Sequence, residues 1–241
     1  MPDIDKPKVL DVGSGTGILV PFIQAKYGRE VGEVEITELD FSREMIAEAR
    51  AKFQSSEGIS EGITDENIRF EVEDIMNFAY PHRYDIILCY SVFPHFDDKE
   101  KALNKLREGL KPEGLLVIFH SSSREEINEM HQSLSDAPVK NDYLPSPEKI
   151  TEMAQKARLE RKYLESKYTE DNQNQDDGID GGENNKIDSK VDGEIYAGVD
   201  SKVDPGIDAG VDGKVDTGVD DEINGEIIEE GFLIIFQPET K

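Results

Sequence analysis

The chain has 241 residues and a formal net charge of −26, with 27 lysine and arginine residues against 53 aspartate and glutamate residues. This length suggests one domain or two, and the acidity argues against a nucleic-acid partner, because phosphates would be repelled over most of the surface. The chain has one cysteine, no apolar run near the ~18 residues of a membrane span and no signal-peptide layout at its start, so we expect a cytoplasmic protein without a membrane partner.

Strand-like and helix-like segments alternate along the chain. Apolar runs predict strands at residues 8–12, 34–40, 68–74, 84–93, 115–120, 159–168 and 230–238. Helical spacing predicts helices at residues 17–28, 41–53, 97–110, 123–134 and 146–157. Ser42, Ser123 and Ser146 are expected N-caps, and Pro112 with Gly114 should stop the third helix. Such alternation implies a mostly parallel sheet with helices on both faces.

An acidic tract separates the last two predicted strands. Residues 170–230 hold 20 acidic residues and four lysines, and from Lys186 a four-residue unit recurs with Val or Ile second and usually Asp third. Gly, Asp and Pro205 are poor strand formers, and Tyr196 is the tract's one aromatic residue, so we expect a disordered insertion at 170–229. A calcium-binding repeat is the alternative, although the glycine-rich nonapeptide pattern of such repeats is missing. The folded domain would then comprise residues 1–169 and 230–241, with the last two strands paired antiparallel.

The sequence VLDVGSGTG at 9–17 places three glycines at the end of the first predicted strand. Closely spaced glycines there allow a sharp turn and the approach of a ligand to bare main chain, and doubly wound folds bind ligands at this edge. Ile18 stands where the dinucleotide fingerprint has its third glycine. Acidic residues close the next two strands, Asp40 and Asp74, and Asp40 is placed to accept the hydroxyls of a ribose.

These segments together resemble the class I S-adenosylmethionine-dependent methyltransferases, of the type 11 and type 25 kind. VLDVGSGTG is similar to the first motif of that family, ELDFSREMIAEAR to the second and VEDIMNF to the third. YDIILCYSVFPHF and LREGLKPEGLLVIFH resemble the fourth and fifth. The likeness covers about residues 7–168 and 231–238. It implies a Rossmann-like, three-layer α/β/α fold with strand order 3-2-1-4-5-7-6 and an antiparallel last strand.

The resemblance also assigns a binding site for S-adenosyl-L-methionine. Asp11 and the loop would hold the methionine part, Asp40 the ribose with Phe41 beside the adenine, and Asp74 the adenine amino group with Ile75 packed on the ring. The wall near the sulfonium would come from the end of the fourth strand. The loop residues are Gly13, Ser14, Gly15, Thr16 and Gly17, and the wall residues are Cys89, Tyr90 and Ser91.

Three of the four histidines fall near the expected active-site edge: His95, His120 and His131. They are candidates for a general base, and with Cys89 for a metal or thiophilic site, although no metal-ligand spacing is present, so no metal is expected. His95 is equally consistent with a structural role. Residues 120–131 are similar to a subgroup of small-molecule methyltransferases, which suggests a substrate-side role for Ser123 and Asn128, together with Phe93.

The expected function is transfer of a methyl group to a small molecule by in-line displacement. The alternative is a non-catalytic scaffold of the same fold whose acidic repeat binds basic partners. Many relatives carry one or two helices before the first strand that close over the site, whereas here only residues 1–8 precede it. Three alternatives follow: residues 121–147 serve as the lid, a partner subunit does, or the lid is missing, which would leave water in the site. The acceptor atom and the oligomeric state are not set by the sequence.

Overall fold

A computed structural model describes residues 4–27, 34–54, 67–134, 142–166 and 231–239. Seven strands form one sheet in the order β3-β2-β1-β4-β5-β7-β6, as predicted. The strands are β1 (Lys8–Val12), β2 (Glu35–Asp40), β3 (Ile68–Val72), β4 (Tyr84–Tyr90), β5 (Leu110–His120), β6 (Leu159–Ser166) and β7 (Phe232–Pro238). The helices are α1 (Val20–Tyr27), α2 (Arg43–Gln54), α3 (Lys99–Gly109), α4 (Arg124–Ser133) and α5 (Pro147–Lys156), with 3-10 turns η2 (Ile75–Asn77) and η3 (Phe93–His95).

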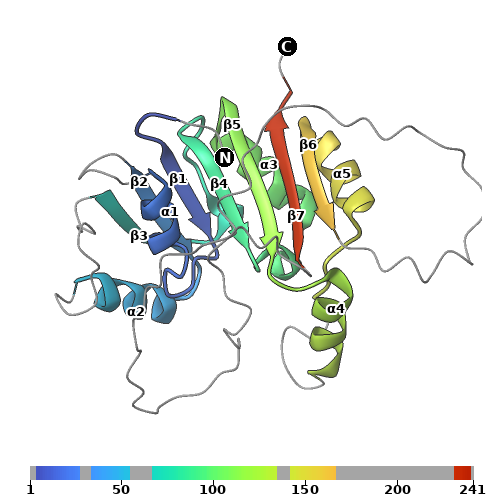
Figure 1. The fold of residues 1–241 in the computed structure, drawn as a ribbon, viewed down its shortest axis with the longest axis horizontal. Helices are drawn as coiled ribbons and strands as arrows, with labels where there is room; N and C mark the ends of the chain where they lie inside the picture. Colours follow the sequence, from blue (N-terminus) through green and yellow to red (C-terminus); the bar gives the residue numbers. More distant parts are fainter. Residues whose placement is uncertain (1–3, 28–33, 55–66, 135–141, 167–230, 240–241) are drawn as a thin grey trace, which may run out of the picture.

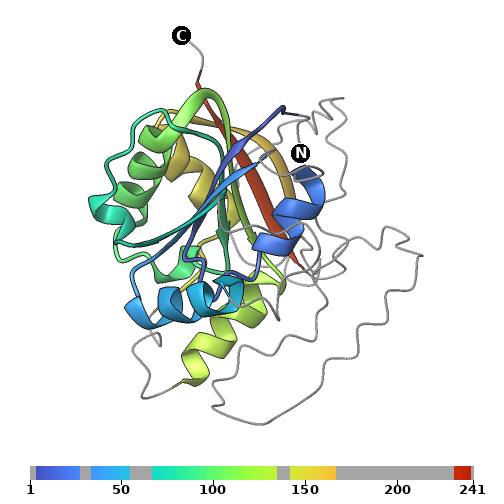
Figure 2. The same ribbon diagram turned by 90° about the vertical axis from the view of Figure 1, so that its left-hand side faces the viewer.

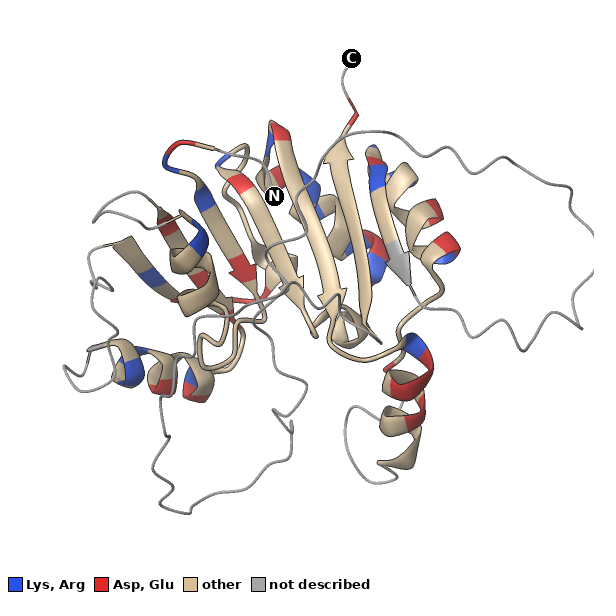
Figure 3. Ribbon diagram, in the orientation of Figure 1, with Lys and Arg blue, Asp and Glu red and all other residues tan. Residues whose placement is uncertain are grey.

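The sheet is covered on both faces, which confirms the three-layer prediction. Figure 2 shows α3 and α5 on one side of the sheet and α1 on the other. Leu10, Ile87 and Ile118 belong to the core beneath α3 and α5, whereas their strand neighbours Val9 and Ile86 belong to the core beneath α1. This alternation follows from the two-residue period of a strand, so strands buried on both faces are apolar almost throughout. Figure 3 accordingly shows few charges on β5 and β7.

The parallel strands all end at the same edge of the sheet, which we call the carboxyl edge. Strands β1 to β5 run parallel, and β7 is antiparallel to both β5 and β6. In Figure 1 the carboxyl edge is the lower one, and α4 extends from it. The segments that follow β1, β2, β4 and β5 therefore meet there, as the topology requires for a ligand site. Within the described ranges, every helix is too short or too polar to cross a membrane.

Local signals set most of the helix boundaries. The Ser42 hydroxyl accepts a hydrogen bond from the Met45 amide, Ser123 and Glu126 form a capping box, and Ser146 caps α5 with Pro147 at its first position. The prediction for β5 was wrong at its start: α3 ends at Gly109 and the strand begins at once with Leu110 rather than Leu115.

The early start of β5 has a packing reason. Leu110 is buried and pairs with Tyr84, and the register of the β4–β5 pair shifts between Tyr84 and Ile86. The irregular register accommodates Pro112, which cannot donate to a ladder, and this residue is exposed. The predicted repeat insertion at 170–229 lies outside the described residues, and so does the calcium-binding alternative.

Candidate functional site

The glycine loop after β1 has the backbone that the sequence predicted. Gly13, Gly15 and Gly17 have φ values of 69°, 55° and 75°, in the left-handed region that disfavours side chains. The amides of Gly13 and Ser14 donate to the Leu39 carbonyl at 2.8 and 3.1 Å, so the loop is fastened to the end of β2. A Cβ atom on Gly13 would lie 2.3 Å from Cγ2 of Val92, whereas a Cβ on Gly15 would meet no atom of the described residues within 4 Å. The main chain at Gly15 is therefore open to a ligand.

Replacement of these two glycines by alanine should have contrasting effects. Gly13→Ala combines a strained φ with overlap on Val92, and we expect it to lower the free energy of unfolding by ~2–4 kcal/mol. Gly15→Ala meets only the backbone strain, ~1–2 kcal/mol, but its methyl group fills the open space over the loop. Urea unfolding measures the first effect, and cofactor affinity of the folded variants measures the second. Equal losses of stability in both variants would contradict the described loop.

Asp40 connects the loop to the start of α2. Its Oδ2 atom accepts a hydrogen bond from the Gly15 amide at 2.9 Å, and its Oδ1 atom accepts one from the Ser42 amide at 2.8 Å. The side chain is largely buried at the carboxyl edge, whereas the next residue, Phe41, is 79% exposed. A carboxylate held by two amides is oriented before any ligand arrives. Phe41, the next residue along the chain, exposes its ring to solvent.

Two further acids lie buried beside the loop. Asp11 on β1 and Glu38 on β2 are direct partners in the parallel register. Among the residues that the structure describes, Asp11 Oδ2 and both Glu38 carboxyl oxygens have no hydrogen-bond partner. Burial, followed by the charge of Asp40, raises the pKa of Asp11 to about 8. Burial, followed by Asp11, raises the pKa of Glu38 well above its usual range. Sequence reasoning identified Asp11 but missed Glu38.

The residues predicted to lie near the adenine and the sulfonium differ in their exposure to solvent. Asp74 is exposed, and its carboxylate caps η2 by accepting from the Met76 amide at 2.9 Å. Ile75 is buried in the core, and so is Cys89, whose thiol pKa is raised chiefly by burial. Tyr90 packs on Phe119 with ring centroids 4.9 Å apart, and Ser91 follows with φ 53°. The cofactor roles assigned to these residues, and to Thr16 in the loop, stay predictions.

The three predicted histidines do come together, at the ends of β4 and β5 and on α4. Nδ1 of His95 lies 2.7 Å from Oδ2 of Asp142, and the His95 and His131 ring centroids are 5.0 Å apart. Nδ1 of His131 lies 3.1 Å from the Asp142 carbonyl oxygen and must donate to it, because a carbonyl only accepts. We call His95, His120, His131 and Asp142 the histidine cluster.

His120 is the innermost member of the histidine cluster. It is 2% exposed, its ring is edge-on to Phe232 at 6.1 Å, and its Nε2 atom has no hydrogen-bond partner in the described part of the chain. Burial, with smaller contributions from His95 and His131, lowers its pKa to about 3, so the ring is neutral at physiological pH. Within the residues described, no three histidine, cysteine or acidic side chains gather closely enough to hold a metal ion.

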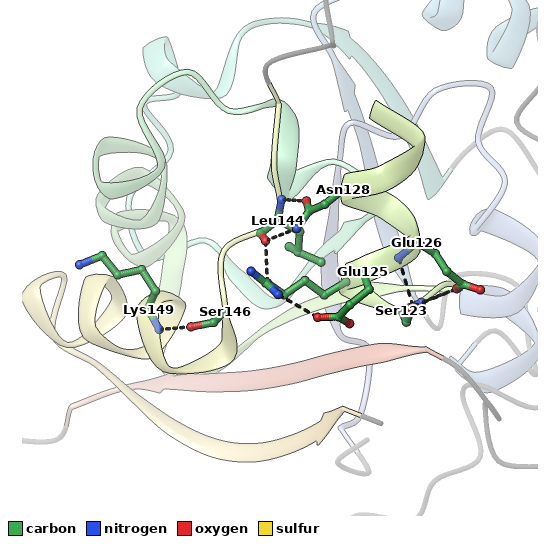
Figure 4. Close-up of polar contacts among 8 residues, drawn as sticks. Ser123, Glu125, Glu126, Asn128, Leu144, Ser146 and Lys149 are labelled. Carbon is green, nitrogen blue, oxygen red and sulfur yellow. Dashed lines mark hydrogen bonds and ion pairs between the residues drawn. The ribbon is translucent and has the colours of Figure 1, made fainter. Parts of the chain in front are cut away.

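The predicted substrate-side residues have structural contacts of their own. Figure 4 shows Ser123 at the start of α4 in its capping box, and Asn128 against the main chain of Leu144. The Asn128 amide accepts from the Leu144 N–H at 2.7 Å and donates to its carbonyl at 3.2 Å. Phe93 is fully buried and packs edge-on to Phe96. Their substrate roles stay predictions, and Asn128 holds the segment that carries Asp142.

The family of the chain follows from comparison with known proteins. Residues 4–173 match the family model described as "Methyltransferase domain", and the chain belongs to this family. It is 30% identical to the malonyl-[acyl-carrier protein] O-methyltransferase of Acetivibrio thermocellus over 54% of this chain and 40% of that protein. It is 35% identical to the ubiquinone biosynthesis O-methyltransferase of Proteus mirabilis over 49% of this chain and 43% of that protein. The chain thus spans less than half the length of these two relatives.

Solved structures agree on the fold. A SAM-dependent methyltransferase from Aquifex aeolicus superposes with a TM-score of 0.50 and 19% sequence identity, over 66% of this chain and 76% of that one. At this identity the likeness concerns the fold alone, because one fold hosts many chemistries. Both the fold and the membership in the class I methyltransferases predicted from the motifs are confirmed.

Proposed function

We propose that this chain binds S-adenosyl-L-methionine and transfers its methyl group to a small-molecule acceptor. The observation that carries the proposal is the open main chain at Gly15, held by the Asp40 carboxylate at the carboxyl edge. A ligand with a nucleoside at one end and an amino acid at the other matches this loop, the acids beside it and the exposed Phe41 ring. The O-methyltransferases among its relatives support the reaction class but leave the acceptor open.

When bound, the cofactor supplies a methyl group on a sulfonium, which is already activated for displacement. The residues of this chain then have to position the acceptor, exclude water and remove a proton if the acceptor arrives protonated. His95 suits the last task. Its Nδ1–H donates to Asp142, which leaves Nε2 as the basic atom, and its side chain is 35% exposed. The His131 ring packs against it, with ring centroids 5.0 Å apart.

Calorimetric titration with S-adenosylhomocysteine tests the binding part of the proposal. Micromolar or tighter binding is expected, and no detectable binding would overturn it. Incubation with methyl-labelled cofactor and a small-molecule extract then tests turnover, with a protein extract as the parallel acceptor. Label in the small-molecule fraction supports the proposal. Binding without turnover in either extract would favour the alternative, a cofactor-binding scaffold.

We also propose that residues 170–229 are an insertion not needed for cofactor binding, with 1–169 and 230–241 forming the methyltransferase domain. Support comes from the strands on either side: β6 and β7 pair antiparallel, with Ser166 opposite Phe232. The two ends of the intervening segment are therefore neighbours, and a short connection can replace it at little entropic cost. A variant lacking about residues 172–224 should bind S-adenosylhomocysteine within about twofold of the full chain. Loss of binding on deletion would contradict this.

A further inference from the structure

We propose that Asp11 and Glu38 share one proton in the free protein and release it when a cationic group of the cofactor is held at the glycine loop. This inference rests on the proposed function and adds a proton-linked, charge-selective step to it. The relevant group on the ligand is its ammonium or its sulfonium. In the step, the O–H bond of one carboxyl breaks, the proton passes to the buffer, and the resulting carboxylate becomes the counterion of the bound cation.

The placement of the two side chains carries the first step. Asp11 and Glu38 are register partners on adjacent parallel strands, so both project from the same face of the sheet. This is the α1 face, because Val9 and Ile36, two residues before each acid, belong to the core beneath α1. The two residues are 1% and 0% exposed. Two carboxyl groups therefore lie together in an apolar layer.

The second step is the contact between this pair and the loop. A Cβ built on Gly17 would lie 3.4 Å from Oε2 of Glu38 and 2.7 Å from Cε2 of Phe53. The Glu38 carboxyl and the Phe53 ring thus both lie close to the glycine loop at Gly17. The buried Ser14 hydroxyl is near enough to lower the pKa of Glu38, but its geometry falls short of a hydrogen bond. The loop therefore has unpartnered polar oxygens on its inner side.

The surrounding charges favour one shared proton. Asp40 repels a charge on Asp11, and a charge on Asp11 in turn adds to the burial that raises the pKa of the Cys89 thiol. Lys52 on α2 acts in the opposite direction by favouring an ionised Glu38. Two carboxylates in a dry site cannot both ionise without a cation beside them, so one stays protonated. A cation bound over the loop supplies the missing charge, and the proton is then free to leave.

Titration calorimetry in two buffers with different ionisation enthalpies counts the protons. At pH 6.5 we expect the wild type to release roughly 0.5–1 proton on binding, and its affinity to rise roughly three- to tenfold between pH 6 and pH 7. Release with both S-adenosylmethionine and S-adenosylhomocysteine assigns the ammonium as the effective cation, and release with S-adenosylmethionine alone assigns the sulfonium. Measurable binding with no proton release overturns the inference while leaving the proposed function intact.

Two matched variants distinguish a proton released by the Asp11–Glu38 pair from one released by the ligand itself. Glu38→Gln should abolish the proton release, whereas Glu35→Gln, the same exchange at an exposed position of β2, should retain it. The ammonium of the ligand titrates identically with both proteins, so the difference between them reports Glu38. Asp11→Asn serves as the second variant if Glu38→Gln does not fold. Equal release from the Glu38→Gln and Glu35→Gln proteins would also overturn the inference.

The thermal stability of the free protein tests the shared proton independently of cofactor binding. An acid whose folded pKa is raised stabilises the protein below its unfolded pKa, and this contribution is lost as pH rises toward the folded value. The Tm of the wild type should therefore fall between pH 4 and pH 8 more steeply than that of Glu38→Gln. Parallel Tm profiles would show that the pair holds no proton. Failure to bind either ligand would instead count against the proposed function.

Discussion

Asp40→Ala should weaken the binding of S-adenosylhomocysteine by roughly 100-fold. The substitution removes the acceptor of the Gly15 and Ser42 amides, at 2.9 and 2.8 Å, together with the carboxylate proposed to hold the ribose. A hydrogen bond to a charged group contributes ~1.5–3 kcal/mol, and each 1.4 kcal/mol corresponds to about tenfold in affinity. Asp40→Asn keeps one acceptor oxygen, so its affinity for S-adenosylhomocysteine should lie between those of the wild type and Asp40→Ala. Isothermal titration calorimetry at constant pH gives the three affinities.

Asp85→Ala provides the matched control. Asp85 also accepts a backbone hydrogen bond, from the Lys8 amide at 2.9 Å, and it pairs with Lys111 at 2.7 Å. It lies at the amino end of β4, on the edge of the sheet opposite the glycine loop. We expect a loss of stability comparable to that of Asp40→Ala but an unchanged affinity. If both variants lost affinity equally, the effect of Asp40 would be a general consequence of destabilisation rather than a local one.

The fold could be predicted from the sequence because its signals are local and agree with one another. Apolar runs of five to ten residues, separated by capped helices, leave few alternatives to a doubly wound sheet. The start of β5 could not be predicted in the same way. Leu110 continues the apolar spacing of α3, and only its pairing with Tyr84 in a neighbouring strand makes it part of β5.

Part of the candidate site could also be predicted from the sequence. The glycine loop, Asp40 and the proximity of the three histidines were predictable, because the strand ends are adjacent in this topology. The contact of Asp142 with His95 could not be predicted, since Asp142 lies in a segment without a motif and its position depends on the Asn128–Leu144 contact. Glu38 had a signal that went unused: an acid in the middle of a strand predicted to be buried on both faces has to be neutral or paired.

His95→Gln should lower the rate of methyl transfer on the order of 100-fold or more, and leave the affinity for S-adenosylhomocysteine within about twofold. Glutamine retains the polarity of the ring but cannot take up a proton at neutral pH. Asp142→Asn should act in the same direction, because an asparagine that donates to Nδ1 would place the ring proton on Nε2 and remove the basic atom. The initial rate, measured with an acceptor found in the extract screen, reports both effects.

His82→Gln is the control for this exchange, since His82 precedes β4 at the opposite edge of the sheet and its Nδ1 lies 3.1 Å from the Leu110 carbonyl. We expect its rate to match the wild type. The pH–rate profile adds a readout that a structural role of His95 would not change: the His95→Gln profile should differ from the wild-type profile in shape and not only in height. Burial keeps His120 neutral down to about pH 3, so a difference in shape near neutral pH does not arise from His120. A His95→Gln protein with the wild-type rate and profile would mean that the acceptor needs no base and that the His95–Asp142 pair only positions η3.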